Sequence, residues 1–139
     1  IKESGLNYVI FRYFNVAGND IDGNMLIQRI KRGEDITILG GDYDTKDGTC
    51  VRDYVHVEDI ASAHLNGIEY LNKGGTGTFN LGNGKGYTIK EICEEAGVNY
   101  EIKGRRESDV IVSVADNTQA VKVLGWKPKK KLNDILRGK

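Results

Sequence analysis

The amino-acid sequence predicts an α/β fold with about one domain over residues 1–139. Short segments rich in β-branched and aromatic residues alternate with segments of helical periodicity, as expected when strands alternate with covering helices. A length of 139 residues fits one domain of the usual ~100–200 residues. An apolar content of 39% predicts a small core.

The first predicted strand covers residues 8–14, because its nearly continuous apolar character is typical of a strand buried on both faces of a parallel sheet. Residues 1–5 before it look like the last turn of a helix that ends at Gly5, so we expect the chain to begin within a fold. Residues 15–23 predict a loop, residues 25–31 a short helix, and residues 36–39 a second strand.

Residues 41–49 are almost all turn formers and predict a long exposed loop. Residues 51–57 alternate between apolar and polar side chains, which predicts a half-buried strand. A helix then begins at Glu58 and continues to about residue 71, and we expect His64 to be packed on its apolar face.

The last elements have clear start and stop signals. Residues 78–81 predict a strand, and the capping box from Thr88 to Glu91 predicts a helix that extends to about residue 96. Residues 100–102 alternate as a short strand. A final helix over residues 117–124 should end at Gly125.

Charge and cysteine content narrow the class of protein. Twenty basic and twenty acidic residues give no net charge, so we expect no nucleic-acid or membrane partner, and we interpret the lysines of residues 127–131 as a solvated face. No run reaches the ~20 apolar residues of a spanning helix. Cys50 and Cys93 are too few for a disulfide framework and lack metal-site spacing, so we expect a cytoplasmic protein without a metal.

One long motif and four short ones identify a family resemblance. Residues 41–59 read GDYDTKDGTCVRDYVHVED, with RYFN at 12–15, FNLG at 79–82, RRESD at 105–109 and LGW at 124–126. Together they resemble the UDP-glucose 4-epimerases, which have the extended short-chain dehydrogenase/reductase fold, and the resemblance covers nearly the whole chain. It implies the carboxy-terminal part of that fold: the last Rossmann-type strands and a small α/β substrate-binding lobe.

Two arginines are the candidates for binding a diphosphate. Arg52 and Arg106 carry fixed charges and planar guanidinium groups that suit bidentate phosphate contacts, and the resemblance implies this role for both. The alternative is structural, with Arg52 paired to Asp53 or Asp59 and Arg106 paired to Glu107.

The resemblance also implies roles for further residues. Asp109 would bind the ribose hydroxyls, Asn15 the nucleotide or phosphates, and Phe14 would line the nicotinamide side of bound NAD. The remaining implied substrate contacts are backbone groups of Thr37, Ile38 and Leu39 at the uracil, Tyr54 beside the phosphates, and Ser113 at the sugar.

Size at Ser113 bears on the choice of sugar. A bulky aromatic side chain there would crowd the 2-substituent, whereas serine leaves room. We therefore expect UDP-GlcNAc and UDP-GalNAc to be accommodated beside the implied partners UDP-glucose and UDP-galactose.

The catalytic motifs of the family do not occur in this sequence. The resemblance implies hydride exchange at sugar C4 through a 4-keto intermediate, which needs a dinucleotide-binding glycine motif and a Tyr-x-x-x-Lys pair. Neither is found within residues 1–139, so we assign no catalytic residue here and expect the chain to be inactive alone. The family implies a homodimer at full length. The alternatives are a related dehydratase or decarboxylase and a non-catalytic UDP-sugar-binding module.

Overall fold

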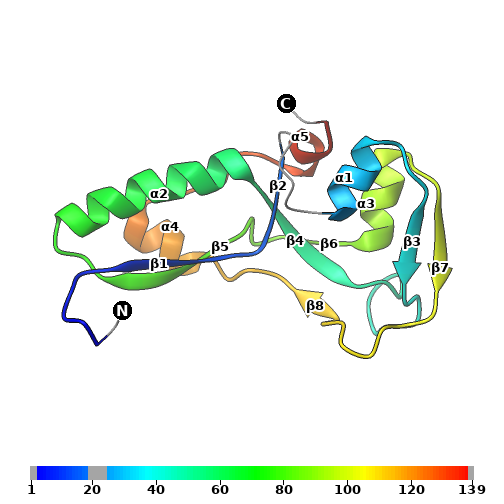
Figure 1. The fold of residues 1–139 in the computed structure, drawn as a ribbon, viewed down its shortest axis with the longest axis horizontal. Helices are drawn as coiled ribbons and strands as arrows, with labels where there is room; N and C mark the ends of the chain where they lie inside the picture. Colours follow the sequence, from blue (N-terminus) through cyan, green and yellow to red (C-terminus); the bar gives the residue numbers. More distant parts are fainter. Residues whose placement is uncertain (1–2, 19–24, 138–139) are drawn as a thin grey trace.

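A computed structural model describes residues 3–18 and 25–137, and within them the predicted α/β class is confirmed. Figure 1 shows an elongated molecule in which strand β4 (Val51–His56) connects two groups of elements. Each group has its own hydrophobic core.

The first group contains a parallel strand pair and two helices. Strand β1 (Val9–Tyr13) pairs in parallel with β5 (Gly77–Leu81), and helices α2 (Val57–Asn72) and α4 (Thr118–Leu124) contact each other on one side of them. The buried Trp126 completes the core, and its indole N–H donates to the Asp59 carbonyl over 2.8 Å.

The second group contains three helices and a second parallel pair. Strand β3 (Ile36–Leu39) pairs with β7 (Tyr100–Lys103), beside α1, α3 and α5 (Figure 1). The helices span Met25–Lys31, Ile89–Ala96 and Leu132–Arg137.

Strand β4 is central because it pairs with three short strands. It is parallel to β2 (Asn15–Ala17) and β8 (Val112–Ser113) and antiparallel to β6 (Gly86–Thr88). Successive strand side chains point to opposite faces, so Tyr54 joins the core of the second group and Val55 that of the first.

Several expectations from the sequence need correction. Asn15–Ala17 is a strand rather than a loop, and residues 19–24 of the expected loop lie outside the described residues. Strand β1 is not buried on both faces, since Val9, Ile10 and Phe11 are half-buried, Arg12 is exposed and Tyr13 is 50% exposed. Gly5 has the positive φ of 71° expected at a helix end, and residues 1–2 of the expected last helical turn lie outside the described residues.

Two further corrections concern β4 and α2. Residues 53–56 are all buried and the expected alternation is absent, because both faces of this part of β4 are covered: Tyr54 lies in one hydrophobic core and Val55 in the other. His64 is exposed rather than packed in the core. Its Nε2 lies 2.8 Å from the Tyr13 hydroxyl, and its ring centroid is 4.8 Å from that of Phe11.

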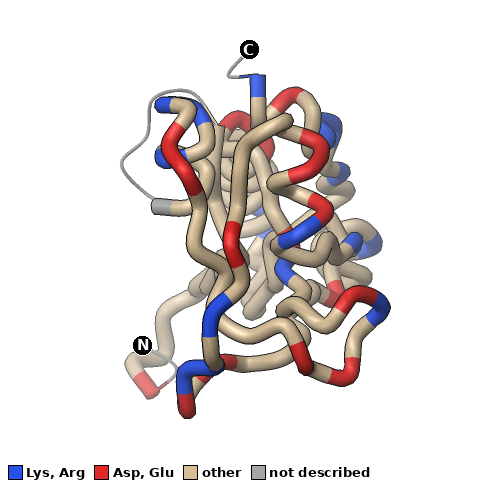
Figure 2. The backbone as a smooth tube through the Cα atoms, turned by 90° about the vertical axis from the view of Figure 1, so that its right-hand side faces the viewer, with Lys and Arg blue, Asp and Glu red and all other residues tan. Residues whose placement is uncertain are grey.

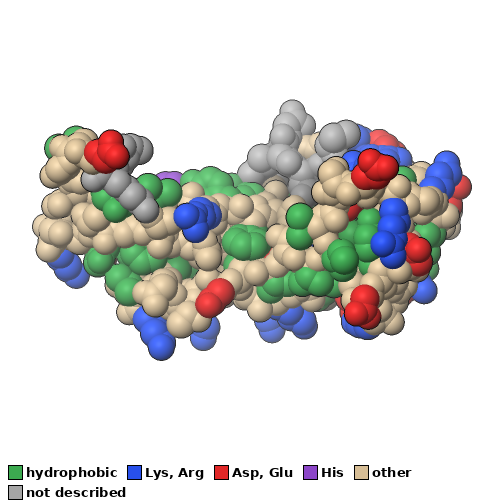
Figure 3. Space-filling model, turned by 90° about the horizontal axis from the view of Figure 1, so that it is seen from below, with side chains coloured by type: hydrophobic (Ala, Val, Ile, Leu, Met, Phe, Trp, Pro, Cys, Tyr) green, Lys and Arg blue, Asp and Glu red, His purple; other side chains and the backbone are tan. Residues whose placement is uncertain are grey.

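The surface carries apolar side chains on both groups of elements. Leu65 and Ile68 on α2 are 65% and 54% exposed. Val110 before β8 and Val112 within β8 are 60% and 54% exposed. Figure 3 shows hydrophobic side chains among polar ones on the face seen from below. In Figure 2, basic and acidic residues are intermingled along the backbone. No helix in the described parts of the chain is long and apolar enough to cross a membrane.

Candidate functional site

A cavity of about 290 Å³ lies among α1, β3, β4 and the segment that follows β7. We call it the arginine cavity, because Arg52 and Arg106 both line it. Eight of the nine substrate-binding residues expected from the sequence lie around it: Asn15, Thr37, Ile38, Leu39, Arg52, Tyr54, Arg106 and Asp109. The fold thus gathers side chains that are up to 94 positions apart, from Asn15 to Asp109.

The wall formed by β3 has a free strand edge. Among the described residues β3 pairs only with β7, so its other edge keeps backbone N–H and C=O groups available for a ligand. The Thr37 hydroxyl is already engaged, because it donates to Glu101 over 3.1 Å. This wall therefore offers backbone groups rather than side-chain donors.

Arg52 has no carboxylate partner in the described parts of the chain, although the sequence offered Asp53 and Asp59 as alternatives. Its Nη1 donates to the Val51 carbonyl over 2.8 Å. The Asp59 carboxylate instead accepts two backbone N–H groups, from Lys129 and Lys130. Arg52 thus retains an unneutralised charge at the cavity.

Asp53 is unable to reach Arg52 because it is fully buried on the other side of β4. Its carboxylate accepts backbone N–H groups from Asn83, Gly84 and Ala115 at 2.8, 2.8 and 3.1 Å. Burial raises the pKa of Asp53, although these hydrogen bonds oppose the increase. Asp53 therefore has a structural role: it links β4 to the turn at Asn83 and Gly84 and to the segment at Ala115.

Arg106 and Asp109 pair with each other at the mouth of the cavity. Arg106 Nε and Nη2 donate to the two carboxylate oxygens of Asp109 over 3.2 and 2.9 Å. The partner considered from the sequence, Glu107, is not the one observed. The Arg106 side chain is 65% exposed and that of Asp109 is 15% exposed, so a ligand can reach the arginine from solvent.

The neighbouring Arg105 has a different role. Its Nε donates to Asp42 over 2.6 Å, and its guanidinium lies 4.3 Å from the centroid of the Tyr43 ring. The hydrogen bond from Arg105 lowers the pKa of Asp42. Of two adjacent arginines, one holds the 41–49 loop and the other lines the cavity.

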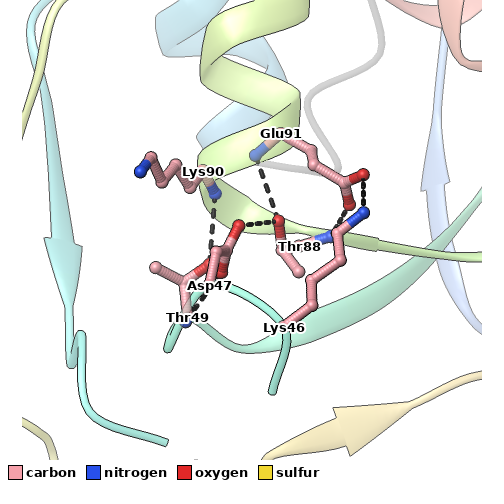
Figure 4. Close-up of polar contacts among 6 residues, drawn as sticks. All are labelled: Lys46, Asp47, Thr49, Thr88, Lys90 and Glu91. Atoms are coloured by element: carbon pink, nitrogen blue, oxygen red, sulfur yellow. Dashed lines mark hydrogen bonds and ion pairs between the residues drawn. The ribbon is translucent and has the colours of Figure 1, made fainter.

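The 41–49 loop is anchored on the N-terminus of α3, and Figure 4 shows the residues that anchor it. Asp47 accepts hydrogen bonds from the hydroxyls of Thr49 and Thr88 over 2.8 and 2.5 Å. The same two hydroxyls accept N–H groups of Lys90 and Glu91 in the first turn of α3. Each threonine therefore links the carboxylate to the positive end of the helix.

This anchoring has an electrostatic consequence. Burial alone would raise the pKa of Asp47, but the hydrogen bonds from Thr88 and Thr49 outweigh it and lower the pKa. Lys46 pairs with Glu91, which also closes the capping box with Thr88. The loop is thus fixed immediately before Arg52.

The remaining predicted residues, Phe14 and Ser113, line a neighbouring cavity of about 560 Å³. Asn15 lines both cavities and so lies between them, and its Nδ2 donates to the Asp53 carbonyl over 3.1 Å. Ser113 on β8 is directly opposite Arg52 on β4 in the parallel ladder. The two cavities therefore meet at Asn15.

Five cavity residues were not anticipated as binding residues: Leu26, Arg29, Ile36, Cys50 and Ile89. Arg29 occupies the last turn of α1, and its Nε donates to Glu34 over 2.9 Å. No residue type or spacing in the sequence distinguished it from the other basic residues. Its place at the cavity depends on how α1 packs against β3.

Among the described residues, no group of three His, Cys, Asp or Glu side chains is arranged to hold a metal ion. His56, which is fully buried, caps α2 by accepting the N–H of Glu58 on Nδ1 over 3.1 Å. Cys50 and Cys93 are both buried and free.

Comparison with known proteins gives close similarity over most of the chain. The UDP-glucose 4-epimerase of Halalkalibacterium halodurans is 40% identical over 146 residues, which cover 90% of this chain but 44% of that protein. The chain thus spans about half the length of the curated relatives it matches.

Two solved structures illustrate the similarity in fold. UDP-glucose 4-epimerase from Bifidobacterium longum in complex with NAD+ and UDP has a TM-score of 0.83 and 34% identity, and the match covers 99% of this chain and 47% of that chain. The UDP-Glc/GlcNAc 4-epimerase from Campylobacter jejuni has a TM-score of 0.78 and 36% identity, covering 95% and 46%.

The family assignment follows from the sequence itself. Residues 1–82, more than half of the chain, match the family model described as NAD dependent epimerase/dehydratase. The long motif of residues 41–59 lies within this match. The chain therefore belongs to the NAD dependent epimerase/dehydratase family.

Proposed function

We propose that residues 1–139 are the carboxy-terminal, nucleotide-sugar-binding part of a UDP-glucose 4-epimerase, which interconverts UDP-glucose and UDP-galactose. The observation that carries the proposal is the convergence of eight expected residues on the arginine cavity. The identity of 40% to a UDP-glucose 4-epimerase supports it. In this proposal the arginine cavity binds the nucleotide sugar, and no catalytic residue is assigned to it.

The diphosphate lies between Arg52 and Arg106 in this proposal. Arg52 has an unneutralised guanidinium, and Arg106 is held only by the exposed pair with Asp109. Binding exchanges that pair for two new contacts: Arg106 turns to a phosphate and Asp109 accepts the ribose hydroxyls. Binding of the diphosphate and binding of the ribose are then coupled, because Arg106 and Asp109 must separate before each can contact the ligand.

The uracil lies along the free edge of β3, where backbone groups of Thr37, Ile38 and Leu39 bind it. Tyr54 lies beside the phosphates, and Asn15 contacts the point where the nucleotide meets the sugar. The sugar extends into the neighbouring cavity towards Ser113 and Phe14.

NAD, when bound, supplies hydride transfer at C4 of the sugar. The described residues fit only a small part of it, since Phe14 offers an apolar ring to the nicotinamide side and the sequence holds no dinucleotide-binding glycine motif. We assign the glycine motif and the Tyr-x-x-x-Lys pair to a further part of the whole protein, which we propose to be a cytoplasmic homodimer active in galactose metabolism.

The first experiment measures UDP binding by isothermal titration calorimetry. Arg52→Ala should weaken UDP binding by at least about tenfold, because a charge-assisted contact contributes ~1.5–3 kcal/mol. Arg137→Ala, at an exposed position on α5 that lines neither cavity, is the matched control. Equal affinities of the two variants would contradict the proposed site.

A second experiment separates an enzyme part from a binding module. UDP-galactose and NAD are incubated with the 139-residue chain, and formation of UDP-glucose is followed by chromatography. We expect binding without turnover from this chain, and turnover from a longer form that contains the Tyr-x-x-x-Lys pair. A longer form that binds but never turns over would favour the non-catalytic module.

Ser113 allows a test of the sugar class. The relative from Campylobacter jejuni is described as a UDP-Glc/GlcNAc 4-epimerase, which supports room for an N-acetyl group in this fold. We expect UDP-GlcNAc to bind with an affinity close to that of UDP-glucose. Ser113→Tyr should weaken UDP-GlcNAc selectively, and equal losses for both sugars would contradict a size effect.

A further inference from the structure

A second cavity, of about 550 Å³, shares no residue with the arginine cavity. It lies among the turn before β6, helix α4 and the segment that leads to α5. We call it the lysine cavity, because five lysines line it: Lys85, Lys127, Lys129, Lys130 and Lys131. The sequence alone predicted that the lysines of residues 127–131 form a solvated face, whereas in the structure they line a cavity.

The backbone that carries these lysines is held in place. The carboxylate of Asp59, which is only 4% exposed, accepts the backbone N–H groups of Lys129 and Lys130 over 3.0 and 2.9 Å. Trp126, three residues earlier, is fastened through its indole N–H to the Asp59 carbonyl. The lysine side chains therefore start from a fixed loop, so less conformational freedom is lost when they bind a ligand.

Most of the positive charge in the lysine cavity is not neutralised. Lys130 pairs with Glu58 over 3.1 Å, and the Lys85 ammonium lies 5.0 Å from the centroid of the Tyr87 ring. Within residues 3–18 and 25–137, Lys127, Lys129 and Lys131 form no ion pair. In a chain without net charge, these lysines make the surface around the cavity locally positive.

The shape and the kind of charge point to a small ligand with several phosphates. The volume falls in the ~300–1,000 Å³ range of small-molecule pockets, and ammonium groups bind phosphate as point charges. An extended nucleic acid is disfavoured, because basic and acidic residues are intermingled elsewhere on the molecule (Figure 2).

We propose that the lysine cavity is a binding site for a compact polyphosphate anion, separate from the arginine cavity. Three unpaired lysines match an anion that carries at least two phosphate groups. This site does not depend on the function proposed for the arginine cavity, since the two cavities have no residue in common.

The test uses inorganic tripolyphosphate as the probe, measured by calorimetry on Arg52→Ala/Arg106→Ala protein so that the arginine cavity contributes little. In this background, Lys127→Gln/Lys129→Gln/Lys131→Gln should weaken tripolyphosphate binding by about tenfold, because three charges that line the cavity are removed together. Lys31→Gln/Lys73→Gln/Lys103→Gln removes the same charge away from the cavity and should weaken it less than about threefold.

Three results would overturn the proposal. The first is equal loss of affinity in both triple variants, which would mean general charge attraction. The second is no tripolyphosphate binding once Arg52 and Arg106 are replaced, which would assign all binding to the arginine cavity. The third is single-stranded RNA binding more tightly than tripolyphosphate at the same salt concentration. Failure of UDP to bind the unmodified protein would affect only the function proposed above.

Discussion

Asp47→Ala tests whether the 41–49 loop owes its position to the carboxylate that Figure 4 shows at the start of α3. Asp47 accepts three hydrogen bonds: from the Thr49 backbone N–H at 2.9 Å, from the Thr49 hydroxyl at 2.8 Å and from the Thr88 hydroxyl at 2.5 Å. Thr49 and Thr88 are 0% and 2% exposed, so alanine leaves two buried hydroxyls without an acceptor.

The expected loss of stability follows from these contacts. Each hydrogen bond to a charged group contributes ~1.5–3 kcal/mol, but Asp47 is half-buried and water can replace part of what is lost. We therefore expect Asp47→Ala to lower the free energy of unfolding by about 3 kcal/mol. With a urea m-value of about 2 kcal/mol/M, the unfolding midpoint should fall by about 1.5 M.

The assay is urea unfolding followed by the fluorescence of Trp126, the single tryptophan, which is 1% exposed in the folded chain. Asp44→Ala is the matched control, because Asp44 is an exposed acid in the same loop. It should change stability by less than about 0.5 kcal/mol. If Asp47→Ala were equally mild, the hydrogen-bond network would not hold the loop and the reasoning would be refuted.

Three further predictions concern pH, backbone strain and thiol reactivity. The pKa of Asp47 is lowered in the folded chain, so the stabilisation that its carboxylate gives is fully present above the ordinary pKa of 3.8. This stabilisation is lost as the pH falls through the lower folded pKa. The free energies of unfolding of wild type and Asp47→Ala should therefore converge only in strong acid. Gly48→Ala should lower the free energy of unfolding by more than about 2 kcal/mol, because φ is +84° and the new Cβ would lie 2.0 Å from the Gly41 carbonyl oxygen; an unchanged urea midpoint would contradict this. Iodoacetamide at pH 8 should label Cys50, which lines the arginine cavity, with UDP slowing the reaction, and should spare Cys93, whose pKa burial raises to about 11; peptide mass spectrometry that finds both labelled equally would count against the cavity assignment.

Local signals in the sequence were sufficient for elements whose ends are set by neighbouring residues. The capping box from Thr88 to Glu91 begins α3 as predicted, since both of its hydrogen bonds lie within four consecutive residues. Gly125 ends α4 with φ of 65°, a conformation that glycine adopts without strain. The family resemblance was also recognised from contiguous motifs, and the match over residues 1–82 confirms it.

Three strands and one helix were not predictable in the same way. Strands β2, β6 and β8 have three, three and two residues, too few to show a periodicity, and they form only because β4 offers partners. Helix α5 follows the lysine-rich segment and was overlooked, although Leu132 and Ile135 are buried in the core. Such short elements are stabilised chiefly by packing against residues that are distant in the sequence.

By itself, then, the sequence determined the fold class and the family, and it predicted the residues of a nucleotide-sugar site. The tertiary structure decided how those residues are used: Arg106 pairs with Asp109 and Arg105 with Asp42, whereas Arg52 has no carboxylate partner among the described residues because Asp53 faces the other side of β4. The physical reason is that the effect of a charge depends on how far away its partners lie and on how deeply they are buried. Contacts between residues far apart in the chain set both the distance and the burial.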